Sequence, residues 1–199
     1  MIVTARLELV AATPDLTRAA LEGGVALAAR LGAEVPPSWP PIYLDAPALE
    51  FMLARLEQGP VQTGWWFYFA LRVDSGGRRL LIGGVGYKGP PSPDGTVEVG
   101  YGIVSEHQRR GYASEAVRGL IAHAFARADV RRVIAETLPE LKPSIGVLRR
   151  CGFRLIGSGS EPGVIRFELT RGEYESGAAA AEEQADIVVD GGAGESASR

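Results

Sequence analysis

The sequence is nearly free of the residues that build disulfides and metal centres. It contains one cysteine, Cys151, and two histidines among its 199 residues. A single cysteine excludes an internal disulfide, and a reducing cytoplasm is therefore the expected location. Two histidines and one cysteine also show no spacing typical of metal ligands, so no metal is expected.

The sequence also lacks a long apolar run and an excess of positive charge. Its longest uncharged apolar stretch, 59–71, is too short to cross a bilayer. Arg6 and Glu8 interrupt the first apolar run, which is unlike a signal peptide. The net charge of −3 indicates no general affinity for nucleic acid. Neither a membrane nor a nucleic acid is therefore expected as a partner.

What remains is the composition of an ordinary globular domain, with 46% hydrophobic and 23% charged residues. The length suits one domain with a full hydrophobic core. From residue 172 onwards small and acidic residues dominate, and such a segment buries too little apolar surface to offset the entropy of ordering it. We therefore expect one domain over 1–171 and a disordered tail over 172–199. A docking peptide around Ile187 is the alternative for this tail.

Strand and helix patterns alternate through the first 171 residues. Alternating or aromatic-rich apolar runs predict strands over 5–10, 65–73, 80–87, 96–104, 132–137, 153–156 and 164–170. Helical spacing predicts helices over 14–31 with a break at Gly23-Gly24, between Asp45 and Gln58, over 114–127 and over 143–150. This order indicates an α/β or α+β fold with a mixed sheet of about six to seven strands.

The most informative stretch lies between a predicted strand and the longest predicted helix. It reads Gln108-Arg109-Arg110-Gly111-Tyr112-Ala113. The first backbone N–H groups of a helix have no intrahelical partner and carry partial positive charge. Gly111 permits backbone angles that other residues avoid, and it lets a ligand approach closely. Together these features predict a cradle for an anion, most often phosphate.

In this order of elements, the motif resembles the Q/R-x-x-G-x-G/A signature of the GNAT superfamily of N-acyltransferases. The run Glu-Val-Gly-Tyr at 98–101 resembles that family's strand before the signature, and 144–153 resembles its last helix, which ends in Gly-Phe. The resemblance spans about residues 5–170 and is strongest to the branch that includes ribosomal-protein N-terminal acetyltransferases. It implies a mostly antiparallel, twisted sheet flanked by helices and splayed at the cofactor site.

The resemblance implies acetyl-CoA as co-substrate and suggests where the chain holds it. The pyrophosphate would lie on backbone N–H groups of the loop and helix start, and the pantetheine arm would pair with the end of the preceding strand. The implied loop residues are Gln108, Arg109, Arg110, Gly111, Tyr112, Ala113 and Ser114, and the implied strand residues are Ile103, Val104 and Ser105. The Val104 N–H is the expected donor to the thioester carbonyl. Arg109 or Arg110 would contact the 3′-phosphate, unless both are simply solvated loop charges.

Acetyl transfer to an amine requires a base, because an alkyl amine with a pKa of about 10.4 is mostly protonated at neutral pH. Glu98 is the candidate, since it is a carboxylate within an apolar strand, on the face opposite Val97 and Val99. The alternative is that Glu98 faces solvent or pairs with an arginine.

The donor that protonates the leaving thiolate departs from the family pattern in this sequence. Many family members carry a Tyr in the last helix, where this chain has Leu148, and Ser144 is the local alternative. A second departure is Leu141, where the family commonly has an Asn that contacts the cofactor.

Aromatic residues precede the signature where the family builds its acceptor pocket. Trp39, Tyr43, Trp66 and Tyr68 are the candidate pocket residues, with core packing as the alternative interpretation for the aromatic strand. Cys151 before Gly-Phe is expected to pack in the core. His107 beside the signature is either a second base or a surface residue.

The sequence therefore predicts an N-acetyltransferase that moves an acetyl group from acetyl-CoA to a primary amine, in a small molecule or at a protein N-terminus, by direct attack on the thioester. The alternative, favoured by Leu141 and Leu148, is a catalytically degenerate module that binds acyl-CoA or another protein. A homodimer is compatible with either function.

Overall fold

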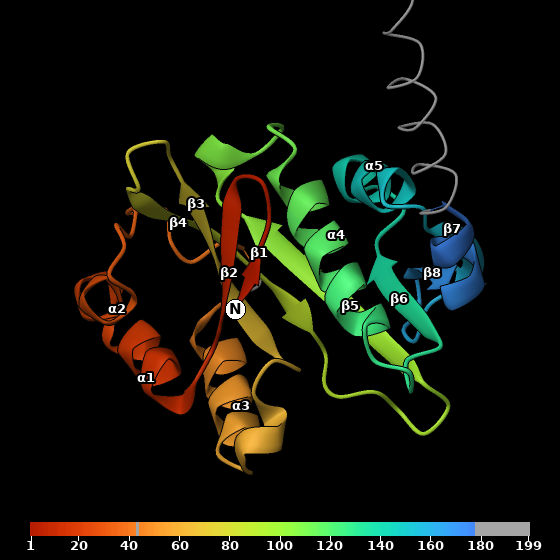
Figure 1. The fold of residues 1–199 in the computed structure, drawn as a ribbon, viewed down its shortest axis with the longest axis horizontal. Coiled ribbons are helices and arrows are strands. Elements are labelled where there is room, and N and C mark those ends of the chain that lie inside the picture. The colour runs from red at the N-terminus through yellow and green to blue at the C-terminus, as the bar shows by residue number, and fades with distance from the viewer. Residues whose placement is uncertain (43, 178–199) are drawn as a thin grey trace, which may run out of the picture.

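The computed structural model describes residues 1–42 and 44–177. Its centre is an eight-stranded sheet with the order β1-β2-β3-β4-β5-β6-β8-β7 (Figure 1). Every neighbouring pair is antiparallel except β5 and β6, which are parallel. The sheet has more strands than the six to seven expected from the sequence. The additional strand is β1, Ile2–Val3, which is too short to show an alternating pattern.

The other elements follow the predicted order. The strands are β2 Leu7–Ala11, β3 Phe67–Val73, β4 Arg79–Tyr87, β5 Thr96–Ile103, β6 Arg132–Thr137, β7 Arg154–Ser158 and β8 Ile165–Thr170. The α-helices are α1 Pro14–Glu22, α2 Gly24–Leu31, α3 Ala46–Leu56, α4 Tyr112–Phe125 and α5 Lys142–Arg150. Short 3₁₀ turns cover Pro60–Gln62 and Ser105–His107.

The helix boundaries have local causes that the sequence already contained. Thr13 caps α1, because its hydroxyl accepts a hydrogen bond from the Leu16 N–H at 3.2 Å. Gly23, with φ of 123°, separates α1 from α2. Asp45 caps α3 through the Ala48 N–H at 3.1 Å. These contacts confirm the two short helices and the helix start at Asp45.

Alternate side chains of the strands enter two separate cores. On β3, Phe67, Phe69 and Leu71 join a core with α2 and α3, whereas Tyr68 and Ala70 join the core under α4. Because successive strand residues point to opposite faces, α4 covers one face of the sheet and α1–α3 cover the other face near β2–β4 (Figure 1).

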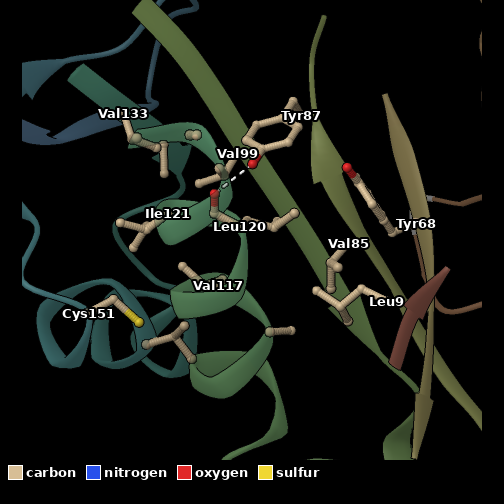
Figure 2. Packing of buried hydrophobic residues seen from close by; sticks show 14 of the residues in the cluster. Leu9, Tyr68, Val85, Tyr87, Val99, Val117, Leu120, Ile121, Val133 and Cys151 are labelled. Carbon is tan, nitrogen blue, oxygen red and sulfur yellow. Dashed lines mark hydrogen bonds between the residues drawn. The ribbon is translucent and has the colours of Figure 1, made fainter. Parts of the chain in front are cut away.

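The core under α4 is mostly apolar, and one of its few hydrogen bonds joins β4 to α4. Figure 2 shows the Tyr87 hydroxyl donating to the Leu120 carbonyl of α4, at 2.6 Å. On the other side of α4, Cys151 directs its sulfur toward the helix (Figure 2). Its Sγ lies 3.5 Å from the Ser114 carbonyl, and burial raises the pKa of this thiol. Cys151 therefore packs between α4 and α5, as the sequence predicted.

Residues 171–177 continue as a helix that packs on the domain. The Tyr174 ring stacks on Phe125 with centroids 4.9 Å apart. Arg171 donates hydrogen bonds to the carbonyls of Phe125 and Val130. The expected boundary after residue 171 therefore falls inside this helical segment, and the rest of the expected tail, 178–199, lies outside the described residues. In the part of the chain that the structure describes, no helix is long and apolar enough to cross a membrane.

Candidate active site

The loop between β5 and α4 has an unusual backbone. Arg109 has a φ of 58° and Gly111 a φ of 83°, so two nearby residues adopt the left-handed conformation. Left-handed residues of this kind are typical of loops whose successive N–H groups turn toward one side and bind an anion. Within the described residues, the N–H groups of 109–114 donate to no acceptor, and no side chain caps α4. The loop therefore has the free donors that an anion requires.

The side chains of this loop divide into exposed and buried ones. Arg109 and Arg110 are exposed, and their guanidinium groups are accessible to a bound anion. The side chains of Tyr112 and Ser114 are buried, at 8% and 4% exposure. Tyr112 and Ser114 thus offer a ligand only their backbone N–H groups.

Arg6, in the turn between β1 and β2, holds this loop in place. Its guanidinium donates to the carboxylate of Glu115, in the first turn of α4, at 2.7 Å. It also donates to the Arg110 carbonyl at 3.2 Å and lies over the Tyr112 ring, 4.6 Å from the centroid. Thr4 completes the network by donating to Glu115 at 2.7 Å. Arg6 both orients the loop and offsets the Glu115 charge near the anion site, a role that sequence spacing does not reveal.

Arg6→Ala is expected to raise the KM for acetyl-CoA by about 3–10-fold, which corresponds to losing about one hydrogen bond from the loop's support. The effect on kcat should be smaller, because Arg6 lies outside the reacting region. Steady-state kinetics at saturating acceptor would measure both constants. Arg18→Ala, which removes a surface pair with Glu57, is the control and should change neither. An unchanged KM for Arg6→Ala would contradict the positioning role.

Strand β5 has one unpaired edge beside this loop. Pairing between β5 and β6 extends only from Thr96↔Arg132 to Glu98↔Ile134. On the other side, β4 pairs with β5 as far as Ile103. From Val99 to Ile103, therefore, β5 has a strand partner only at its β4 edge within the described residues. This is the splayed site that the sequence predicted.

The backbone register corrects one prediction. Val104 donates its N–H to the Ile82 carbonyl at 2.9 Å, so this group is not available to a thioester. The Glu98 carbonyl likewise accepts from the Lys88 N–H at 2.9 Å, which shows that even-numbered residues bond to β4. Peptide groups alternate between the two edges of a strand, so Tyr101 and Ile103 face the open edge instead. The sequence therefore assigned the donor to the wrong edge of β5.

Gln108 connects the loop to this open edge. Its side-chain amide donates to the Ile103 carbonyl at 2.8 Å. The bond fixes the end of β5 relative to the start of the loop. The Gln108 N–H donates to the Ser105 carbonyl at 3.2 Å, so the prediction that this group belongs to the anion cradle is wrong, and the glutamine has a structural role instead. Ser105 is exposed at the same strand end, and its hydroxyl donates to Glu106 at 3.1 Å.

Glu98 lies on β5, on the face opposite α4, with its side chain 20% exposed. Lys88, the neighbouring residue on the β4 side, places its ammonium in ion-pair contact with Oε1 of Glu98. The predicted base is thus paired with a lysine, where the sequence alternative had an arginine.

A second carboxylate, Glu136 on β6, lies on the same face and was not singled out from the sequence. It accepts hydrogen bonds from the Ser160 N–H, the Ser160 hydroxyl and the Arg166 guanidinium, at 2.9, 2.7 and 2.7 Å. Burial would raise the pKa of Glu136, but these hydrogen bonds outweigh it and the net pKa is lowered. A carboxylate stabilised in this way is a poor proton acceptor, and its role is to anchor the loop after β7.

Ser144, the predicted acid, pairs with a tyrosine that the sequence did not identify as a site residue. The Tyr101 hydroxyl lies 3.0 Å from Ser144 Oγ and 3.1 Å from the Ser144 carbonyl. Burial raises the pKa of Tyr101 to about 12, although the Ser144 hydrogen bond lowers it slightly. Leu148, one turn further along α5, is fully buried. Tyr101 thus brings a phenol to the α5 side of the splay from β5, where the family's usual tyrosine is missing.

The aromatic pocket prediction is partly wrong. Tyr68 is 2% exposed in the core under α4, and its hydroxyl donates to the Gly64 carbonyl at 2.8 Å, so it lines no open pocket. Trp39 is half-buried against Phe69, with ring centroids 5.9 Å apart. Trp66 is also half-buried and donates to Gln62 at 2.7 Å. Tyr43 lies outside the described residues.

The space next to Glu98 is bordered by glycine and proline. A side chain added at Gly100 would meet no atom within 4 Å, so the sheet face is open there. A side chain at Gly102 would meet Pro41 at 3.4 Å, which places the 39–42 loop over the next position. The open space above Gly100 therefore lies between Glu98 and this loop.

His107, the other candidate base, is half-buried at the start of the loop. Burial and the nearby Arg110 lower its pKa, and its Nδ1 accepts or donates no hydrogen bond within the described residues. His107 lies on the loop that follows the open edge of β5. Of the two candidate bases, Glu98 is the one that borders the open space on the sheet.

Comparisons with known proteins agree with this geometry. Residues 6–154 match the family model described as the acetyltransferase (GNAT) domain. The chain is similar to an aminoglycoside acetyltransferase, AAC(6')-Ib, solved with coenzyme A, at a TM-score of 0.57 and 18% identity, covering 85% of this chain and 98% of that one. It is also similar to RimL, a ribosomal L7/L12 α-N-protein acetyltransferase solved with coenzyme A, at a TM-score of 0.56 and 20% identity, covering 84% and 96%.

Curated relatives match over shorter segments. YjdG of Bacillus subtilis (strain 168), an uncharacterized N-acetyltransferase, is 35% identical over 75 residues, which are 38% of this chain and 45% of that protein. The uncharacterized N-acetyltransferase p20 of Bacillus licheniformis is 32% identical over 102 residues, 47% of this chain and 57% of that protein. The matches thus span about half the length of these relatives. The family model, the splayed sheet and the anion loop together show that the chain belongs to the GNAT family of acetyltransferases, enzymes that use acetyl-CoA.

Proposed function

We propose that the protein transfers the acetyl group of acetyl-CoA to a primary amine by direct attack on the thioester. The observation that carries this proposal is the position of Glu98. Its carboxylate is held only by an exposed lysine and borders the open space above Gly100, on the strand whose free edge leads to the anion loop. One strand and the loop after it therefore carry, in order, a base, a space for the amine and a site for the cofactor phosphates.

The chain's backbone would hold the co-substrate. The free N–H groups of 109–114 suit the pyrophosphate, with Arg109 and Arg110 adding positive charge. The open edge of β5 suits the pantetheine arm, because its peptide groups have no strand partner from Val99 to Ile103. We assign the Ile103 or Tyr101 N–H, in place of that of Val104, as the donor that polarises the thioester carbonyl.

Glu98 accepts the amine proton on the face opposite α4, which leaves the amine free to attack. The leaving sulfur lies toward the α5 side, where Tyr101 and Ser144 offer two hydroxyls. Because the pKa of Tyr101 is raised to about 12, the phenol stays protonated and acts as a hydrogen-bond donor to the thiolate. A thiol with a pKa of about 8.5 then takes its proton from solvent with little further help.

The competing function is an acyl-CoA-binding module without turnover, and the burial of Leu148 at the family's usual tyrosine position favours it. The Tyr101–Ser144 pair weakens that argument, since it supplies a phenol from another element. A panel of small amines and peptides with free N-termini, assayed by thiol release with acetyl-CoA, separates the two. Tight binding of acetyl-CoA without thiol release for any amine would favour the module.

Filling the acceptor space should impair the amine without affecting the cofactor. Gly100→Val adds an isopropyl group whose Cβ would meet no atom within 4 Å, and valine favours strands, so folding should be retained. The KM for the amine is expected to rise roughly tenfold or more, because crowding at a binding site costs about 1–3 kcal/mol. The Kd for CoA should stay unchanged by calorimetry. An unaltered KM for the amine would place the acceptor elsewhere.

A further inference from the structure

We propose that Lys88 is an internal acceptor, acetylated by the protein's own active site, and that its acetylation releases Glu98. This inference rests on the proposed function, because it takes Glu98 as the base. The starting observation is compositional. Only two of the 21 basic residues are lysines, Lys88 and Lys142. One of these two side-chain amines lies in ion-pair contact with the predicted catalytic carboxylate.

The position of Lys88 is the one that an acceptor amine needs. Its Nζ is in ion-pair contact with Oε1 of Glu98. The contact is held at the backbone level too, since the Lys88 N–H donates to the Glu98 carbonyl at 2.9 Å. An incoming amine bound by Glu98 must therefore replace the Lys88 ammonium, which stands where that amine would be deprotonated.

Lys88 is also free to move toward the thioester. Its side chain is 61% exposed, and an exposed ion pair contributes only about 0–1 kcal/mol. The long methylene stem allows the amine to leave Oε1 and enter the adjacent space above Gly100, where an added Cβ would meet no atom within 4 Å. Lys142, at the start of α5, is also exposed but forms no ion pair within the described residues, so it lacks a base.

The transfer balances without another reactant. The Lys88 ammonium gives one proton to Glu98, and the free amine attacks the thioester carbonyl carbon. A C–N bond forms, the C–S bond breaks and the electron pair leaves on the CoA sulfur. The nitrogen loses a second proton, the thiolate gains one, and one proton passes to solvent. The products are Nε-acetyl-Lys88 and CoA with a free thiol.

Acetylation would change the state of the site, because an acetylated lysine carries no charge and cannot pair with a carboxylate. Glu98 would then be free for an external amine. The expected signature is a lag in thiol release that shortens when the protein has first been incubated with acetyl-CoA.

The test is to incubate the full chain with acetyl-CoA alone and to measure acetylation of Lys88 and Lys142 by peptide mass spectrometry over time. Lys88 should be modified at a first-order rate that does not depend on protein concentration, and roughly 100-fold faster than Lys142. Glu98→Gln should slow modification of Lys88 by a similar factor and leave Lys142 unaffected. Lys88→Arg should keep thiol release at its slow initial rate, because arginine retains the charge and cannot be acetylated, while Lys142→Arg should keep the lag.

Two results would overturn the inference. In one, Lys88 stays unmodified while the amine panel gives thiol release, so the proposed function stands and the internal acceptor fails. In the other, both lysines are acetylated equally and independently of Glu98, which means chemical acetylation only. If neither the amine panel nor Lys88 gives thiol release, the proposed function fails as well.

Discussion

Glu98→Gln is expected to lower kcat/KM for the amine by about 10²–10⁴-fold at neutral pH, the usual contribution of a general base. The amide keeps the size of the side chain but cannot accept the amine proton. It also removes the charge that holds Lys88, whose ion pair is exposed and contributes little to stability. The fold should therefore survive, and the loss should appear in catalysis.

The pH dependence of the activity loss in Glu98→Gln tests whether the missing group is a base. A free amine with a pKa of about 10.4 increasingly deprotonates itself as pH rises, so the difference between wild type and Glu98→Gln should narrow toward high pH. Thiol release from pH 6 to about 10 would measure it. Glu136→Gln is the matched control, because that carboxylate lies on the same face but anchors Ser160 and Arg166. The main effect of Glu136→Gln should be a lower thermal stability. Full activity of Glu98→Gln at every pH would refute the base assignment.

The anion loop was predictable from the sequence because its physics is local. A glycine before an apolar helical run and the lack of a capping side chain are features of consecutive residues, and the structure places them as expected. The helix starts at Thr13 and Asp45 were predictable for the same reason. The pyrophosphate site itself remains a prediction, supported by the free N–H groups.

Features that depend on pairing between distant segments were not predictable. The edge to which Val104 directs its N–H depends on the register with β4, which no local pattern encodes. The Lys88–Glu98 and Tyr101–Ser144 contacts likewise arise only when separate strands and helices meet. Tyr68 was assigned to the pocket because an aromatic strand has two faces, and composition does not say which face is covered.

Gly111→Val is expected to weaken CoA binding by roughly 10–100-fold. Gly111 has a φ of 83°, where a β-branched residue is strained by about 1–3 kcal/mol. A Cβ there would also lie 3.4 Å from Arg6 Nη2, so the loop has little room to keep its shape. If the loop relaxes, the N–H groups of 109–114 lose their common direction. Losing one or two hydrogen bonds to an anion costs about 1.5–3 kcal/mol, which gives the expected range.

Gly77→Val separates this effect from backbone strain in general. Gly77, in the turn between β3 and β4, has a φ of 77° and no atom within 4 Å of an added Cβ. It therefore has nearly the same backbone conformation as Gly111 but lies in a different loop. Both variants should lose similar thermal stability, whereas only Gly111→Val should lose affinity for CoA in calorimetry. Equal CoA affinity in the two variants would show that the left-handed loop backbone does not form the phosphate site. Backbone strain would then explain the whole effect of Gly111→Val.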